Sequence, residues 1–354
     1  MADENGSETS FVYTFLDDND DDNISSTSTS TNINCQRDLQ HVLHIIERAA
    51  YAAGEVALST AGQIAVKTTK ANTRDLVTES DVECQRLIKE IILNEFPRDV
   101  FLGEEDVGSN NSDSSVASSG ALKDALGIAE GSGEEEDDDD RLLFVVDPID
   151  GTTNFQAGLP IYAMSIGVVS LVGNIPEVVA GVIYNPTLGE MTSAVRGRGC
   201  YLNNKRINPH PTTNDNNNNT QQKPRQSILS ESLINVGFPV CKESTLLASS
   251  RAVTALATQV RGLRMVACAS QAMAWVAHSK FAAYFSWDLN AWDIAAGMVI
   301  VEESGGRVDN FDGSRADVSS RDMIISCRPE REGEEGLLRD ELIRVLEDND
   351  CVEY

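Results

Sequence analysis

The stretch Arg141-Leu-Leu-Phe-Val-Val-Asp147-Pro-Ile-Asp150-Gly-Thr-Thr-Asn-Phe155 decides how the rest of the chain is interpreted. Its first half is a short apolar run, which predicts a buried strand that ends at Val146. Pro148 cannot continue a sheet ladder, and Gly151 accepts backbone conformations that other residues resist. Asp147 and Asp150 are therefore expected at the edge where the strand stops.

The residues after these aspartates are suited to a helix start. Backbone amides of Gly151, Thr152 and Thr153 are expected to open a helix beside the two carboxylates. Carboxylates next to free N–H groups make a place where hard cations and a phosphate can bind together. Asp-Pro and Asp-Gly are also common turn dipeptides, so each is weak evidence when taken singly.

The net charge of −28 over 354 residues is unevenly distributed. Residues 1–34 contribute −8 and residues 109–140 contribute −9, which leaves about −11 for the remainder. The folded part is thus only moderately acidic, and no basic face for nucleic acid is expected.

Cysteine spacing and hydropathy indicate the cellular compartment that is expected for the protein. The seven cysteines form no C-x-x-C pair, so they are interpreted as reduced and mostly structural. No segment approaches the roughly 18 consecutive apolar residues of a membrane span, and the acidic start at Met1–Gly6 does not have the pattern of a signal peptide. A soluble cytoplasmic protein is expected, although the Ser/Thr-rich residues 25–32 leave organellar targeting open.

Three segments of biased composition divide the chain. Residues 1–36 are predicted to be a disordered acidic and Ser/Thr-rich tail. Disordered insertions are predicted near 107–140, with one helical turn around 121–129, and at 211–225. The acidic run within 107–140 lacks the glycine turn of an EF-hand loop, so a solvated linker is favoured over a calcium site.

The remaining sequence predicts a folded domain over 37–330 in two halves, about 37–210 and 226–330, followed by a helix and tail over 331–354. Helices are expected at 38–61, 82–96, 244–260, 271–278, 294–301 and 336–346, and strands at 66–70, 100–103, 141–146, 162–171, 177–184, 190–195, 227–230, 263–266, 281–285, 307–308 and 323–326. Asp293 is expected to cap or begin the helix that follows it. The alternation of strands and helices predicts a layered α/β architecture.

Five acidic residues stand out by their position. Glu104, Glu105, Asp147 and Asp150 follow strands, and Asp293 stands at a helix start behind Trp292. An all-carboxylate group without His or Cys favours Mg²⁺ over zinc. Two such ions can neutralise phosphate oxygens, steady a leaving alkoxide and lower the pKa of an attacking water. A neighbouring carboxylate and the Thr152 hydroxyl could orient that water.

Three motifs in this order resemble the inositol monophosphatase family of magnesium-dependent, lithium-sensitive phosphatases. They are Gly103-Glu-Glu105, Asp147–Phe155, and Trp292-Asp293-x-Ala-Ala-Gly297 with Glu303-x-Gly-Gly306. The resemblance covers residues 37–330 apart from the two insertions. It implies an αβαβα sandwich, a phosphoric monoester hydrolase and, as is usual in the family, a homodimer.

The resemblance also implies roles for individual residues. The first Mg²⁺ would be held by Glu104, Asp147 and the Ile149 carbonyl. The second would be held by Asp147, Asp150 and Asp293. Glu104 would also help to hold a weaker third ion. Thr152 would activate water with Glu104, Asp81 would support Thr152, and Lys70 would lie near the metal-bound water. The amides of Gly151 and Thr152 would bind phosphate, next to Thr153.

The sequence departs from the family pattern at a position that contributes to substrate specificity. Family members that favour inositol phosphate commonly carry a glutamate seven residues before the Trp-Asp aspartate, whereas this chain has Ser286 there and Asp288 two residues later. Inositol 1-phosphate is the expected substrate. Histidinol phosphate, galactose 1-phosphate and a 3′-phosphonucleotide stay open as alternatives, as does a regulatory or binding protein that retains the fold.

Overall fold

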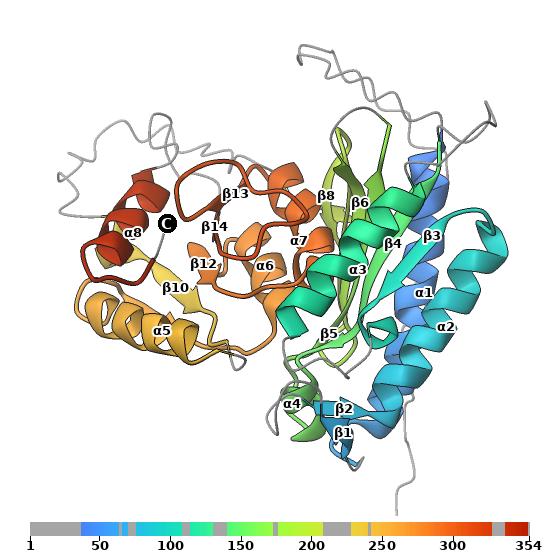
Figure 1. Cartoon of the computed structure of the whole chain (residues 1–354), viewed down its shortest axis with the longest axis horizontal. Coiled ribbons are helices and arrows are strands. Elements are labelled where there is room, and N and C mark those ends of the chain that lie inside the picture. Colours follow the sequence, from blue (N-terminus) through green and yellow to red (C-terminus); the bar gives the residue numbers. More distant parts are fainter. Residues whose placement is uncertain are drawn as a thin grey trace, which may run out of the picture. The chain divides into compact units, whose positions relative to one another are not determined.

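The computed structural model describes residues 37–63, 66–69, 76–107, 114–129, 140–172, 176–207, 228–239, 242–327 and 337–352. These residues belong to one compact unit (Figure 1). The predicted tail at 1–36 and the insertion at 211–225 lie outside the described residues, as does most of the acidic run at 134–140.

A seven-stranded sheet forms the larger of the two main sheets among the described residues. Its order is β3 (Val100–Gly103), β4 (Leu142–Asp150), β5 (Ala163–Ser170), β6 (Glu177–Asn185), β7 (Glu190–Val195), β8 (Gly199–Leu202) and β9 (Lys205–Arg206). β3 and β4 run parallel, and the other neighbours are antiparallel. All nine residues of β4 are buried, because helices cover both faces of the sheet, and this explains the continuous apolar run.

Two long helices cover one face of this sheet. α1 (Leu39–Thr60) packs on β5, β6 and β7, and α2 (Glu79–Glu95) packs on β4. Asp38 caps α1 by accepting the backbone N–H groups of residues 40 and 41. The short strands β1 (Val66–Thr69) and β2 (Leu76–Thr78) pair antiparallel, and Thr78 then caps α2 in a capping box with Asp81.

The second main sheet has five strands in the order β11 (Gly262–Arg264), β10 (Leu233–Val236), β12 (Ala283–Ser286), β14 (Met323–Ser326) and β13 (Arg307–Asn310). β10 runs parallel to both β11 and β12. The outer face of this sheet packs against α5 (Glu243–Leu256) and α8 (Leu337–Glu347), whose Leu342 and Leu346 are fully buried.

Two helices lie between the sheets. α6 (Ala269–Ala277) and α7 (Ala291–Glu303) pack on each other, and their side chains join those of both sheets in one hydrophobic core. α7 is apolar over most of its circumference because it is surrounded by protein. It lies close to the large sheet, since a Cβ at Gly167 would come within 2.5 Å of the Ala295 Cβ and one at Gly181 within 2.8 Å of the Ala296 Cα.

The predicted αβαβα architecture is confirmed by this order of layers, and most predicted elements are present. Four details were wrong, and the strands β2, β8 and β9 were not predicted. α3 (Ser114–Ala129) is a helix of 16 residues where one turn was expected. The strand predicted at 227–230 begins only at Leu233, after a 3₁₀ turn over Leu229–Glu231. β4 continues to Asp150, and α7 begins at Ala291 after Asn290, so that Asp293 takes part in the capping box from within the first turn.

The close approach of α7 to the sheet predicts that Gly167→Ala lowers the free energy of unfolding by about 1–3 kcal/mol, because the new methyl group overlaps Ala295. Gly120→Ala in α3 is the matched control, since its added Cβ would meet no atom within 4 Å apart from the neighbouring residues and backbone of its own helix. We expect that control to gain about 0.5–1 kcal/mol from helix propensity. Urea unfolding measures both, and equal stability of Gly167→Ala and the wild type would contradict the packing described.

Candidate functional site

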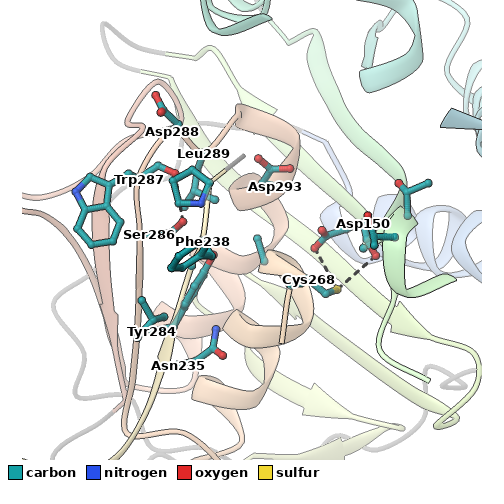
Figure 2. A pocket seen from close by; sticks show the side chains of 18 residues that line it. Asp150, Asn235, Phe238, Cys268, Tyr284, Ser286, Trp287, Asp288, Leu289 and Asp293 are labelled. Atoms are coloured by element: carbon teal, nitrogen blue, oxygen red, sulfur yellow. Dashed lines mark hydrogen bonds between the residues drawn. The ribbon is translucent and has the colours of Figure 1, made fainter. Parts of the chain in front are cut away.

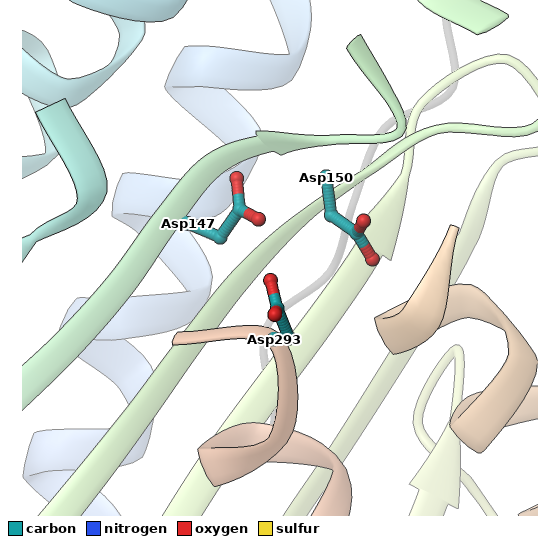
Figure 3. A group of neighbouring side chains, drawn as sticks. All are labelled: Asp147, Asp150 and Asp293. Carbon is teal, nitrogen blue, oxygen red and sulfur yellow. The ribbon is translucent and has the colours of Figure 1, made fainter. Parts of the chain in front are cut away.

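Three aspartate side chains converge where the end of β4 meets the start of α7 (Figure 3). One oxygen from each of Asp147, Asp150 and Asp293 lies within 4.8 Å of the other two. Asp147 and Asp150 are buried, and Asp293 is partly exposed. The fold thus brings together three predicted carboxylates, two from β4 and one from α7. The residue from α7 lies more than 140 positions further along the chain.

An irregularity in β4 turns Asp147 and Asp150 to the same side. Residues three apart in a regular strand point to opposite faces of the sheet. Here Asp147 pairs with Ser165 and Asp150 pairs with Ala163, so a three-residue step on β4 faces a two-residue step on β5. The extra residue makes a β-bulge, which is one of the few places where a sheet accepts a proline such as Pro148.

Each carboxylate is oriented by local hydrogen bonds. Asp150 Oδ2 accepts the backbone N–H and the hydroxyl of Ser270, both at 2.6 Å, and the Cys268 thiol at 3.3 Å (Figure 2). Asp147 Oδ1 accepts the Ile149 N–H at 3.0 Å, and Asp293 Oδ2 accepts the Asn290 N–H at 2.7 Å. These bonds fix the orientation of the three side chains.

Burial raises the pKa of all three carboxyls above the ordinary aspartate value, and repulsion by neighbouring carboxylates adds to it for Asp147 and Asp293. For Asp147 burial is the larger cause, followed by the charges of Glu104, Asp150 and Asp293. Burial also dominates for Asp293, where the Asp150 and Glu104 carboxylates add to it. For Asp150 burial is again the largest cause, and the hydrogen bonds from Ser270 and Cys268 oppose it.

The predicted water-activating residues lie beside this group. Glu104 follows β3, whose Gly103 pairs with Val146, so its carboxylate stands next to Asp147 and raises the pKa of that residue. The Thr152 hydroxyl lies 3.3 Å from Asp81 Oδ1 and 3.2 Å from the Ile149 carbonyl oxygen, and it can donate to only one of these acceptors at a time. Lys70, the remaining predicted residue of this set, lies outside the described residues.

A cavity of about 280 Å³ extends from the aspartates toward the small sheet (Figure 2). Asp150, Gly151, Thr152, Thr153 and Asp293 line one side of it. Gly151 has a φ of +87°, in the left-handed region that favours glycine, and it precedes the short helix α4 (Thr152–Gln156). The first N–H groups of such a helix have no partners within the helix.

The predicted substrate residues Ser286 and Asp288 line the other side of the cavity. The Ser286 hydroxyl donates to the Trp287 carbonyl at 3.2 Å. Asp288 Oδ1 accepts Lys242 Nζ at 2.8 Å, and its buried Oδ2 has no hydrogen-bond partner among the described residues.

Four residues of this site were missed by the sequence reasoning. Ser270 and Cys268 contact Asp150, and Asn154 donates to the carbonyls of residues 161 and 266 at 2.8 Å, which ties α4 to the loop after β11. Asn235 lines the cavity from β10. The one available signal was the position of Cys268, which stands directly before the helix α6.

The donor set fits a hard divalent cation. Asp147, Asp150 and Asp293 could hold one through carboxylate oxygens, with Glu104 and the Ile149 carbonyl close by, and oxygen ligands without thiolate or imidazole suit Mg²⁺. A cation would also relieve the repulsion that raises the pKa values of Asp147 and Asp293.

The sequence matches the model of the inositol monophosphatase family over residues 38–345. It is 32% identical to inositol monophosphatase 1 of Solanum lycopersicum over 70% of this chain and 76% of that protein. It is 30% identical to a fructose-1,6-bisphosphatase/inositol-1-monophosphatase of Thermotoga maritima over 80% of this chain and 86% of that protein. The solved structure of an IMPase from Thermotoga maritima aligns with a TM-score of 0.64 at 27% identity, covering 88% of this chain and 98% of that one. Among the helices that the structure describes, each is too short or too polar to cross a membrane.

The raised pKa values predict how stability responds to pH and metal. Above the ordinary aspartate pKa the unfolded chain is ionised at these positions while the folded chain retains protons, so metal-free stability falls as pH rises toward the folded pKa values. Mg²⁺ competes with these protons, so we expect it to raise the melting temperature more at pH 8 than at pH 5.5. At about 100 times its dissociation constant it contributes about 2.7 kcal/mol.

Asp147→Asn tests the same site directly, since it removes one charge and keeps the acceptor for the Ile149 N–H. We expect the metal-free variant to melt a few degrees above the wild type at pH 8, and to lose most of the stabilisation by Mg²⁺. A variant that melts lower without metal and retains the full Mg²⁺ response would contradict this description of the site.

Proposed function

The chain belongs to the inositol monophosphatase family, and we propose that it is a Mg²⁺-dependent phosphatase that hydrolyses inositol 1-phosphate to inositol and phosphate. The observation that carries the proposal is the convergence of Asp147, Asp150 and Asp293 within 4.8 Å of one another at the edge of a cavity of about 280 Å³. A compact group of buried carboxylates beside the start of α4 suits a phosphate whose charge is compensated by cations.

The proposed Mg²⁺ ligands are the oxygen-bearing groups that lie around the three aspartates. Asp147, Asp150 and Asp293 hold Mg²⁺, with Glu104 and the Ile149 carbonyl completing two or three sites. When bound, the ions supply charge stabilisation for the phosphate and leaving oxygen and a lowered pKa for a bound water. Because no described Lys or Arg lines the cavity, the protein itself offers little positive charge to the phosphate.

Thr152 is proposed to orient the attacking water. Its hydroxyl lies within reach of Asp81 Oδ1 and the Ile149 carbonyl, which are both acceptors, so its own proton has a partner and its lone pairs can accept from water. Asp81 is held in turn by the N–H of Thr78 at 2.9 Å. Glu104, next to Asp147, is proposed to take the proton that the water gives up.

The substrate alcohol is proposed to lie against Ser286 and Asp288. The unpartnered Oδ2 of Asp288 is an acceptor for a substrate hydroxyl, and this supports a polyhydroxy leaving group. Relatives at about 30% identity are named for inositol phosphate and for fructose bisphosphate. Inositol 1-phosphate is therefore the first substrate to test, and a sugar phosphate the second.

A homodimer and a cytoplasmic location are part of the proposal. The dimer is the usual state implied by the family resemblance. The five cysteines in the described part of the chain are all free thiols, which supports a reducing compartment.

Thr152→Ala is expected to lower kcat by about 100- to 10,000-fold, because the attacking water loses its positioning hydroxyl. KM and the Mg²⁺-induced rise in melting temperature should change little, because no metal ligand is removed. Thr152→Ser retains a hydroxyl and is the matched control, with activity within about tenfold of the wild type. Activity of Thr152→Ala equal to that of the control would contradict the role given to this hydroxyl.

A phosphate-release screen tests the reaction and its substrate. The purified protein with Mg²⁺ is offered inositol 1-phosphate, galactose 1-phosphate, fructose 1,6-bisphosphate, histidinol phosphate and adenosine 3′,5′-bisphosphate. We expect the highest kcat/KM with inositol 1-phosphate, and no turnover by Asp150→Asn with its fold retained. No release from any compound would contradict the proposal and favour a binding protein that retains the fold.

A further inference from the structure

The wall of the cavity that the small sheet forms includes a residue without a role in the reaction, Asn235 of β10. β10 runs parallel to β11 and β12, and the cavity is lined by the segments that leave the carboxyl ends of these strands. In open α/β sheets this edge is where ligands bind. Asn235 therefore stands at a favourable place for contact with the part of a substrate that extends away from the aspartates.

Hydrogen bonding fixes the orientation of the Asn235 amide. Its Oδ1 accepts the backbone N–H of Val266 at 3.2 Å. Because an N–H group requires an acceptor, the oxygen and not the nitrogen must face Val266. The Nδ2 group is consequently directed elsewhere, and in Figure 2 it points to the side of the cavity where Phe238 and Tyr284 lie.

No hydrogen bond joins the Asn235 amide nitrogen to a described residue, and 1% of the Asn235 surface is exposed. The nitrogen is not one of the fully buried side-chain atoms that lack a partner, so it keeps a small exposed area at the cavity that Asn235 lines. A donor that faces a cavity without a protein acceptor normally binds a ligand or an ordered water.

We propose that Asn235 is a specificity-determining residue, which donates a hydrogen bond from Nδ2 to an oxygen of the alcohol part of the substrate. The inference rests on the proposed function and deepens it, because it names the chemistry of the leaving group. With the phosphate at Asp150 and Asp293, the alcohol would extend toward the small sheet, where Asn235 and Asp288 line opposite ends of the cavity. Asn235 is then the donor and Asp288 the acceptor, a pair that suits a polyhydroxy alcohol and gives nothing to a plain alkyl or aryl group.

Asn235→Asp separates this role from a structural one. The substitution keeps an oxygen for the Val266 N–H and replaces only the donor by a second acceptor. The measurement is kcat/KM for inositol 1-phosphate divided by kcat/KM for phenyl phosphate, whose six-membered ring carries no hydroxyl group. Dividing by the second substrate removes any effect of the new charge on the shared phosphate.

We expect this ratio to fall about tenfold in Asn235→Asp, mostly through KM for inositol 1-phosphate, and to fall similarly in Asn235→Ala. The control is Asn185→Asp, at a buried asparagine whose amide is fully engaged, with Nδ2 donating to the Pro160 carbonyl at 3.1 Å and Oδ1 accepting the Leu188 N–H at 3.0 Å. That control should lower the melting temperature and leave the ratio unchanged.

Other outcomes overturn the inference in distinguishable ways. A ratio within twofold of the wild type in a folded Asn235→Asp or Asn235→Ala makes Asn235 structural, as does a failure of both variants to fold. A wild type that hydrolyses phenyl phosphate and not inositol 1-phosphate removes the polyol assignment alone. A wild type that hydrolyses neither compound contradicts the proposed function and, with it, this inference.

Discussion

Repulsion between Asp147, Asp150 and Asp293 is the constraint on which the rest of the structure depends. Their oxygens lie within 4.8 Å of one another, and burial removes the water that would screen them. The fold holds them there by three devices: the bulge in β4, the close packing of α7 on Gly167 and Gly181, and the capping of α6 by Asp150. The stability of both sheets and their helices is what offsets the cost of this charge, and a divalent cation would remove much of it.

Two parts of the chain line the cavity, and each faces a different part of the proposed substrate. The end of β4 and the start of α4 supply the charged side, where phosphate chemistry is expected. The carboxyl ends of three parallel strands in the small sheet supply the other side, which carries Asn235, Tyr284 and Ser286. With this arrangement, the residues that face the alcohol can differ between proteins while the residues that face the phosphate, and so the reaction, stay the same. The existence of relatives named for different phosphate esters is consistent with this separation.

Local sequence was sufficient to predict most helices and strands and to single out the three aspartates, because apolar runs, caps and carboxylates at strand ends are short-range signals. It was misleading for α3, whose Ser- and Gly-rich composition hid a helix, and for Pro148, which sits in a bulge inside β4. Ser270, Cys268 and Asn235 were beyond its reach, because their contacts join residues more than 30 positions apart. Such pairings follow from how the layers stack, which spacing along the chain does not encode.

The most direct test of the central claim is an anomalous difference map from crystals soaked in Mn²⁺, a scattering substitute for Mg²⁺ at oxygen-ligated sites. We expect at least one strong peak among the carboxylates of Asp147, Asp150 and Asp293, with its height reduced in Asp147→Asn crystals. A map with no peak there, or with peaks only elsewhere on the molecule, would contradict the account of these carboxylates as a metal site.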